Sequence, residues 1–291
     1  MKYYSFNQYL KDTFGQKVYK ISLNAGFTCP NRDGTIDTRG CIFCSKGGSG
    51  DFAESSVLSV TQQIENGKSR VKNKIKSGKY IAYFQAFTNT YAPTEVLRSK
   101  FFEAINHKDI AALSIATRPD CLPDNVIELL DELNKIKPVF VELGLQTINE
   151  ESAKYIRRGY PLSAYDEAVE KLKKININIV THIILGLPNE TKEDMLNSVK
   201  YVCSGKTNGI KLQLLHVLKN TDLADDYYAG KFRALELEEY LDIIKACVDI
   251  IPKNIVIHRL TGDGAKKDLI APLWSANKKL VLNNINKALN E

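Results

Sequence analysis

Seven runs rich in apolar and β-branched residues recur along the 291-residue chain, and this rhythm constrains the fold more than any other feature. They lie near residues 18–25, 80–87, 110–116, 138–146, 177–185, 209–217 and 254–260, separated by segments of helical period. Runs such as IAYFQAF and NIVTHIILGL are nearly continuously apolar, as in a parallel sheet covered on both faces. We therefore expect an α/β fold in which about six βα units form an incomplete (β/α)6 barrel, with the working groups at the carboxyl ends of its strands.

Two of the intervening helices have readable boundaries. Thr191 with Asp194 three residues later forms a capping box and predicts a helix start. A second helix is expected from about Thr94 through Ile105. The chain length suits one large domain with short terminal extensions, so we predict a core domain over residues 1–265 and a C-terminal helical extension over 266–291.

The composition, with 44% hydrophobic and 25% charged residues, is typical of a soluble globular protein. No stretch approaches the roughly 18 apolar residues of a membrane-spanning helix, and the first residues lack the apolar core of a signal peptide. We expect a cytoplasmic protein without a membrane partner. The net charge of +6 is compatible with a polyanion such as RNA, although basic runs are usually solvated helix faces. Those runs are Lys72, Lys74, Lys76 and Lys79, and Lys171, Lys173 and Lys174.

Three of the six cysteines, Cys29, Cys41 and Cys44, have the spacing C-x11-C-x2-C. A tight turn brings the last two together, and the glycine-bearing loop lets Cys29 return to the same point. Three thiolates without a nearby fourth ligand favour an iron–sulfur cluster with one open iron over structural zinc, which needs four closed ligands. Zinc, or merely buried or reactive thiols, are the alternatives. The isolated cysteines, Cys121, Cys203 and Cys247, are expected to be small buried hydrophobes, although Cys121 follows a strand end.

Three motifs in order carry a resemblance to a known family. They are CPNRDGT at residues 29–35, YFQAFTNTY at 83–91 and TRPD at 117–120. With the three cysteines, they identify the chain as similar to the radical S-adenosylmethionine (SAM) superfamily, whose fold is an incomplete TIM-like barrel. Within it, the chain looks like the YhcC/YtqA subfamily, which is similar to the radical SAM domain of the Elongator catalytic subunit. The resemblance covers roughly residues 1–265.

The resemblance implies two cofactors, a 4Fe–4S cluster held by the three cysteines and SAM bound to its open iron. In such enzymes the reduced cluster cleaves SAM, and the resulting 5'-deoxyadenosyl radical abstracts hydrogen from the substrate. An electron donor such as flavodoxin or ferredoxin is then a partner. Gram-positive members of the subfamily, called MnmL, are implicated in converting 5-carboxymethylaminomethyluridine at the tRNA wobble position (U34) to 5-aminomethyluridine, so tRNA is the expected partner.

Polar side chains in or after the apolar strands are the candidate cofactor contacts. Arg118 ends the third strand, where a charged planar fork suits a carboxylate or phosphate, unless it only pairs with Asp120. Glu142 and Gln146 alternate on the fourth strand and share one face, which lines the cavity if it is the interior.

Other candidates come from the resemblance. Phe43 looks like the aromatic residue beside the adenine, and Arg158 like the arginine that meets the SAM carboxylate, although a helix C-terminal charge explains it or Arg157 equally well. His182 matches a polar contact to the ribose, or is a core histidine.

Gln85 and Asn89 follow the second strand, where the superfamily receives the methionine amine, but here without the usual small-residue pair, so a simple polar turn explains them as well. His216 and His258 are weaker candidates for facing the substrate. No catalytic residue is predicted.

Two other functions remain open at this point. One is a radical SAM enzyme acting on a small molecule or a tetrapyrrole, as in the coproporphyrinogen oxidase relatives. The other is a nucleic-acid-binding protein whose cysteine loop holds structural zinc.

Overall fold

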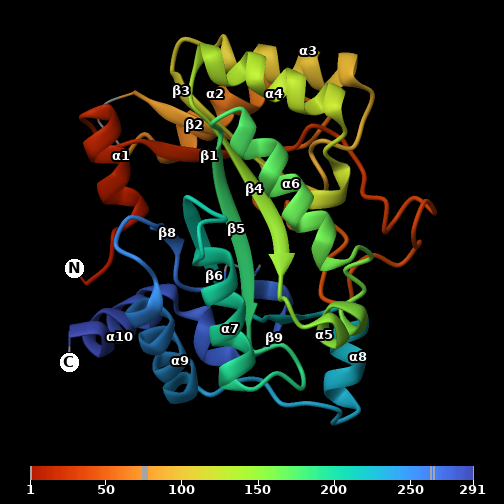
Figure 1. Ribbon diagram of the computed structural model, residues 1–291, viewed down its shortest axis with the longest axis vertical. Coiled ribbons are helices and arrows are strands. Elements are labelled where there is room, and N and C mark those ends of the chain that lie inside the picture. Colours follow the sequence, from red (N-terminus) through yellow and green to blue (C-terminus); the bar gives the residue numbers. More distant parts are fainter. Residues whose placement is uncertain (1, 74–77, 263, 265, 291) are drawn as a thin grey trace.

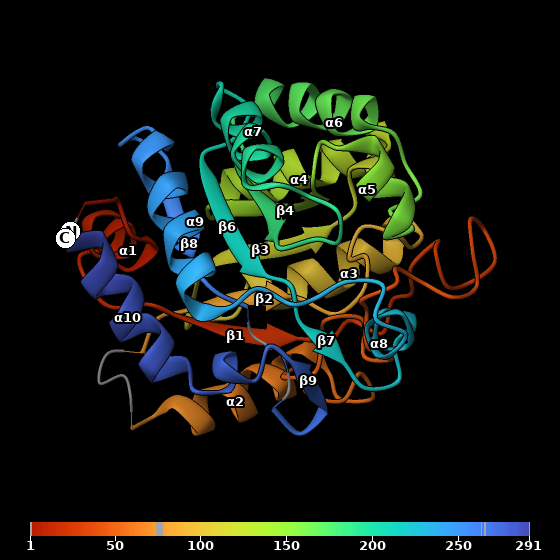
Figure 2. The same ribbon diagram turned by 90° about the horizontal axis from the view of Figure 1, so that it is seen from below.

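The computed structural model describes residues 2–73, 78–262, 264 and 266–290. Within them a parallel seven-stranded sheet has the order β1-β2-β3-β4-β5-β6-β8. It curls into an open barrel (Figure 2). The strands are β1 Tyr19–Leu23, β2 Tyr80–Phe84, β3 Ile110–Thr117, β4 Val139–Gln146, β5 Asn178–Leu185, β6 Gly209–Leu214 and β8 Val256–Arg259. A separate antiparallel pair consists of β7 Val217–Leu218 and β9 Leu269–Ala271.

Helices connect successive strands and cover the outer face of the sheet (Figures 1 and 2). The crossover helices are α2 Val60–Val71, α3 Thr94–Ile105, α4 Asp124–Ile136, α5 Glu150–Tyr155, α6 Leu162–Lys174, α7 Lys192–Cys203, α8 Asp222–Tyr228 and α9 Leu237–Ile250. The flanking helices are α1 Phe6–Phe14 and α10 Lys278–Asn290, and short 3-10 turns span Pro119–Cys121, Lys266–Asp268 and Leu273–Ala276. The buried faces of these helices and of the sheet form one large apolar core.

The predicted fold class is confirmed, since six βα units are followed by the seventh strand β8. Each predicted run contains a strand, but the run at 209–217 is divided, because β6 ends at Leu214 and β7 pairs with β9 instead. The capping box is present, with the Thr191 side chain accepting from the Asp194 amide and the Asp194 side chain accepting from the Thr191 amide. The helix over 94–105 is α3.

The amino end of the barrel is closed by apolar side chains. Ile81, Ala112, Phe140 and Val180, near the starts of four successive strands, pack together with Leu10 of α1. The ring of Phe6, at the start of α1, stacks on His258 with the ring centroids 4.0 Å apart. The interior is therefore sealed at the end opposite the cysteine loop.

The terminal and basic segments have ordinary structural surroundings. Helix α10 buries Val281, Ile285 and Leu289 and lies against α9. Lys171 pairs with Asp124 at 2.7 Å, and its run forms the last turn of α6. Lys74 and Lys76 lie outside the described residues. Among the helices of the described residues, none is long and apolar enough to cross a bilayer.

Candidate active site

The three clustered cysteines lie on the long loop that follows β1, at the carboxyl end of the barrel. All three line one cavity, of about 240 Å³, that extends into the barrel interior. The Cys44 amide donates to the Cys41 carbonyl at 3.0 Å, which is the tight turn expected for two ligands of one centre. None of the three forms a disulfide. The spacing in the sequence therefore becomes a convergence of three thiols in space.

Two polar side chains, the buried Asn31 and the half-buried Arg32, hold this loop. The Asn31 side-chain amide donates to the Arg157 carbonyl at 2.7 Å and approaches the Cys41 sulfur at 3.5 Å. The Arg32 guanidinium donates to the Cys44 and Ser45 carbonyls at 3.2 and 2.7 Å. The cysteine loop is thus fixed both to itself and to the segment after α5.

The electrostatic surroundings of the cysteines differ from those of the isolated thiols. The pKa of Cys41 is lowered to about 6, mainly by the hydrogen bond of Cys41 with Cys44. The nearby guanidinium groups of Arg118 and Arg32 lower this pKa further. The same contact raises the pKa of Cys44, so the pair shares one proton. By contrast, burial raises the pKa of each isolated cysteine to about 12, as expected for inert buried thiols. These are Cys121, Cys203 and Cys247.

Two small residues, Ala116 and Gly144, leave room for the cavity. Ala116 lies one residue before the end of β3 and Gly144 two residues before the end of β4, and both line the cavity together with Gln146, the last residue of β4. Gln146 has a positive φ of 73°, and its side-chain oxygen is buried without a hydrogen-bond partner among the described residues. Because buried polar groups are normally satisfied, this oxygen indicates a ligand group in the cavity.

Glu142 is the centre of a charged layer between the cavity and the apolar floor. Its side chain is fully buried, and both oxygens are engaged. One accepts from Lys20 and, at 2.5 Å, from the Ser114 hydroxyl. The other accepts from Lys211 and, at 2.8 Å, from His182 Nε2. Glu142, Lys211 and His182 also line the cavity.

The pKa values in this layer reflect one carboxylate among several cations. Burial opposes ionisation of Glu142, but Lys20, Lys211 and His182 outweigh it and hold its pKa well below the usual range. Burial lowers the pKa of Lys211 to about 7, and although Glu142 opposes this shift, nearby Lys20 and Arg259 reinforce it. Burial also lowers the pKa of His182 to about 4, so its imidazole is neutral and donates through Nε2.

Seven of the eight residues predicted as cofactor contacts line this one cavity. They are Phe43, Gln85, Arg118, Glu142, Gln146, Arg158 and His182. The eighth, Asn89, is fully buried beside it and donates to the carbonyls of Phe84 and Ala116 at 3.0 and 2.9 Å. Asn89 thus joins the ends of β2 and β3, and its contact with a cofactor stays a prediction, as do the contacts of the other seven.

Both arginines have protein partners in addition to facing the cavity. Arg118 forms a two-pronged pair with Asp120, at 3.0 and 2.7 Å, and its Nη1 donates to the Arg158 carbonyl. Arg158 pairs with Glu150 at 2.9 Å and donates to the Thr147 carbonyl at 2.7 Å. The guanidinium of Arg118 thus places three of its five donors on Asp120 and the Arg158 carbonyl.

The two other histidine candidates, His216 and His258, lie in different parts of the barrel. His216 lines the cavity, whereas His258 lies at the sealed amino end against Phe6. Gln85 lines the cavity with its side chain donating to the Ser49 carbonyl at 2.7 Å, which ties the cysteine loop to β2.

Sequence reasoning missed the cations of the charged layer, Lys20, Lys211 and Arg259. For the two lysines the signal was the same as for Glu142, because each is a charged residue inside a mostly apolar strand, as in YKISL and GIKLQL, whereas Arg259 is the last residue of its strand. Charged residues are rarely placed there without a partner. Tyr83, whose hydroxyl contacts Lys211 at 3.2 Å, was missed for the plainer reason that aromatic residues are common in strands.

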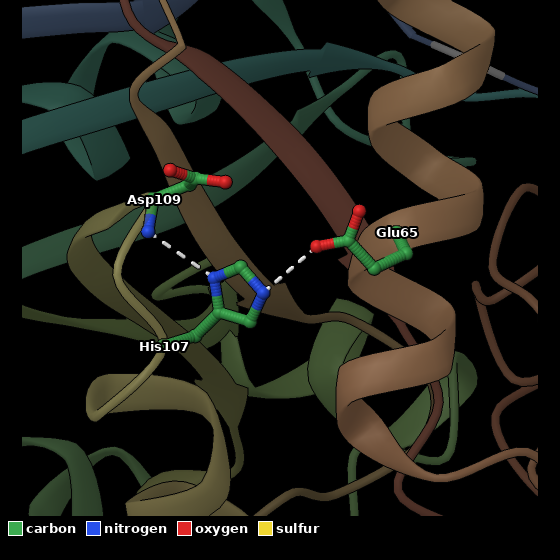
Figure 3. Close-up of side chains that lie close together, drawn as sticks. All are labelled: Glu65, His107 and Asp109. Carbon is green, nitrogen blue, oxygen red and sulfur yellow. Dashed lines mark hydrogen bonds and ion pairs between the residues drawn. The ribbon is translucent and has the colours of Figure 1, made fainter.

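A second cluster of ligand-type side chains lies on the outer surface and does not line the cavity. Figure 3 shows His107 between Glu65 and the Asp109 backbone, with Nε2 3.0 Å from Glu65 and Nδ1 accepting from the Asp109 amide at 3.2 Å. The ammonium group of Lys68 lies 2.8 Å from Glu65 and 2.6 Å from Asp109. Lys68 already supplies the positive charge that a metal would bring, so the cluster is an ion-pair network.

Comparison with known proteins agrees with this site. The model of the radical SAM superfamily matches residues 34–202, and that of the radical SAM C-terminal domain matches residues 207–291. YtqA of Bacillus subtilis (strain 168) is 47% identical over 99% of this chain and 89% of its own length. YhcC of Escherichia coli (strain K12) is 35% identical over 96% of this chain and 89% of its own length.

More distant proteins share the fold. The structure of archaeal Elp3 from Methanocaldococcus infernus, with an N-terminal deletion, has a TM-score of 0.69 at 18% identity and covers 93% of this chain and 63% of its own. The tRNA uridine(34) acetyltransferase of Methanocaldococcus jannaschii is 27% identical over 56% of this chain and 30% of its own length.

The chain belongs to the radical SAM superfamily. Within that class it is a member of the YhcC/YtqA subfamily. It is therefore a radical SAM enzyme, and the cofactors of its family are a 4Fe–4S cluster and SAM.

The residues present fit these cofactors. Three soft thiols converge on one cavity, and the partnerless Gln146 oxygen lies in the same cavity. When bound, the cofactors supply a radical that abstracts a hydrogen atom from the substrate. The chain itself supplies a sealed floor that excludes water from below, and a charged layer that fixes the electrostatic potential beside the reacting groups.

Proposed function

We propose that this enzyme modifies the wobble uridine (U34) of tRNA and converts its 5-carboxymethylaminomethyl group to 5-aminomethyl. The bond between the nitrogen and the carboxymethyl carbon is broken, the two carbons leave as glyoxylate with an oxygen from water, and SAM, the oxidant, is converted to methionine and 5'-deoxyadenosine. The similarity to YtqA and YhcC over nearly the whole chain supports placing it with that subfamily's chemistry. The named action of the more distant relative on uridine 34 supports the position in the tRNA.

The lining of the cavity is the observation that carries the proposal. The cavity has a volume of about 240 Å³ and is lined by the three loop cysteines, by the small residues Ala116 and Gly144, and by Glu142, His182 and Lys211 of the charged layer. A slender polar substituent on a base can enter such a space if the nucleotide is turned out of the anticodon loop. Enzymes that act on a base generally take it out of its stack in this way, at low cost for a single strand.

The roles proposed for the residues follow from their places. Cys29, Cys41 and Cys44 hold the cluster. Cofactor contacts are proposed for the seven cavity-lining candidates, with Phe43 beside the adenine, Arg158 at the SAM carboxylate, and Gln146 and His182 toward the ribose or substrate. Asn89 supports the backbone that receives SAM. The electron comes from a donor such as flavodoxin or ferredoxin.

The test is direct conversion of the nucleoside. Anaerobically reconstituted and reduced enzyme is incubated with SAM and tRNA that carries 5-carboxymethylaminomethyluridine at position 34, and the nucleosides are measured by mass spectrometry. The proposal predicts loss of that nucleoside and an equal gain of 5-aminomethyluridine, with no change for the Cys44→Ala variant. Intact substrate after SAM has been cleaved by the wild-type enzyme would reject the tRNA reaction and favour a small-molecule substrate.

A further inference from the structure

The charged layer holds more positive than negative charge. Glu142 is its carboxylate, and it faces the ammonium groups of Lys20 and Lys211. Two ammonium groups thus share one carboxylate even when Arg259, which lines the same cavity and has an interaction of its own, is left out of the count. His182, neutral at ordinary pH, does not change this balance. A buried surplus of cations is costly unless an anion joins it.

Other carboxylates of the cavity do not correct this surplus. Among the described residues that line it, the acidic ones are Glu142 and Asp51. Asp51 accepts hydrogen bonds from Ser45 of the cysteine loop, at 3.1 and 3.2 Å, and so belongs to the mouth. Among the described residues, Glu142 is therefore the one carboxylate beside Lys211, and the base of the cavity favours an additional negative group.

Lys211 is placed to receive that group. It is buried, lines the cavity and uses two donors on Glu142 and the Tyr83 hydroxyl, which leaves the third donor of its ammonium for a ligand. Its neighbours across the sheet are His182 on β5 and Arg259 on β8. Lys20, in contrast, bonds the other oxygen of Glu142, lies between the rings of Phe6 and Tyr83, and does not line the cavity.

We propose that Lys211, with Arg259 beside it, binds a carboxylate at the distal end of the substrate side chain. This inference rests on the proposed function, because the carboxymethylaminomethyl group ends in a carboxylate and the aminomethyl product does not. Lys211 thus makes the enzyme select the substrate over its product. Binding of the carboxylate at this site also places the atoms of the substituent between the carboxylate and the base across the middle of the cavity.

Depth distinguishes this group from the other anions of a tRNA complex. Lys211 lies three residues before the end of β6, which is about 10 Å below the carboxyl end of the barrel at 3.3 Å per residue. A backbone phosphate is attached to its ribose, so it stays outside when the substituent at C5 of the base points into the cavity. The carboxylate of SAM is excluded by its role at the cysteine loop, at the opposite end of the cavity.

The test measures binding without turnover. Reconstituted enzyme with SAM but without reductant is titrated with two fluorescent anticodon stem-loops that differ only in carrying 5-carboxymethylaminomethyluridine or 5-aminomethyluridine at position 34. A charge-assisted hydrogen bond contributes about 1.5–3 kcal/mol, so the wild type should bind the carboxylate-bearing stem-loop about 10- to 100-fold more tightly. The Lys211→Met variant should lose this preference and keep its affinity for the aminomethyl stem-loop.

Lys20→Met is the matched control. It removes the same charge from the same carboxylate, Glu142, without touching the cavity. This variant should keep the wild-type preference, and loss of the preference in both variants would show that general damage to the layer, not a contact from Lys211, is responsible and would overturn the proposal.

The wild type alone gives a second test that does not depend on the folding of a variant. Equal affinity for the two modified stem-loops, both tighter than for an unmodified stem-loop, would overturn the carboxylate site and leave the tRNA function standing. If all three stem-loops bind equally or none binds, the proposed function fails and the carboxylate site fails with it.

Discussion

Replacing Glu142 with glutamine removes the carboxylate that neutralises the interior of the barrel while keeping the size of the side chain. The glutamine amide carries no charge and offers one acceptor oxygen in place of two. The Glu142 carboxylate accepts hydrogen bonds from four side chains, those of Lys20, Ser114, His182 and Lys211. Breaking a buried ion pair by removing one partner costs about 3–5 kcal/mol, because the other partner stays buried and uncompensated. For a chain of this size, we expect a melting temperature on the order of 10 °C lower.

The pH dependence of this loss follows from Lys211. Its pKa of about 7 in the folded protein is depressed from the unfolded value, so its protonated form opposes folding below pH 7 and this penalty is relieved as the pH rises above 7. Without Glu142 the folded pKa falls further. As the pH rises toward 7, the free energy of unfolding of the variant therefore increases relative to that of the wild type by about 1.4 kcal/mol per pH unit, so the deficit shrinks. Above pH 7 the deficit stays constant.

The assay is thermal or urea unfolding of the wild type and the Glu142→Gln variant, under anaerobic conditions, between pH 5.5 and 8.5. Glu193→Gln is the matched control, since Glu193 is 66% exposed and 3.4 Å from Lys200, and such surface pairs contribute about 0–1 kcal/mol. A Glu142→Gln deficit that equals the control, or that does not shrink between pH 5.5 and 7, would refute the reasoning about the charged layer.

Three further predictions concern the cysteine loop and the scaffold. Replacing any one of the three loop cysteines with alanine should abolish iron retention and SAM cleavage, and retained cleavage would contradict the ligand assignment. Gly159→Ala should lower iron content, because its Cβ would lie 2.6 Å from Asn31 Oδ1, whereas Gly205→Ala, with a similar φ but open space, should not; equal iron in both would contradict the steric argument. Thr191→Ala should cost about 1 kcal/mol in an unfolding titration by removing the cap of α7 while leaving SAM cleavage unchanged, and unaltered stability would show that the cap is dispensable.

The sequence was most informative where one local pattern decides the outcome. Continuous apolar runs predicted the parallel strands, because burial on both faces requires apolar residues at every position. The capping box of Thr191 was readable since it depends on residues three apart. The end of β6 was misplaced, because Val217 and Leu218 continue the apolar pattern but pair with β9, which lies some fifty residues further along.

The site was only partly readable because its polar contacts join distant strands. Glu142 was recognisable as a charged residue in an apolar strand, but its partners Lys20 and Lys211 lie 122 and 69 residues away. The pairing of Arg118 with Asp120 was foreseeable at a separation of two residues. The position of Asn89 behind the cavity wall depends on how β2 and β3 end side by side, which no local pattern reveals.

We propose that a radical enzyme whose cluster is held by three cysteines acts on a modified tRNA. The most direct measurement is formation of 5'-deoxyadenosine by the reconstituted, reduced enzyme, with tRNA carrying 5-carboxymethylaminomethyluridine at position 34 and with the same tRNA unmodified there. The account predicts that the modified tRNA raises the rate well above the level without tRNA, and that the unmodified tRNA does not. Equal rates in all three reactions would contradict the tRNA substrate, and no cleavage by an enzyme with a verified, reduced cluster would contradict the account at its base.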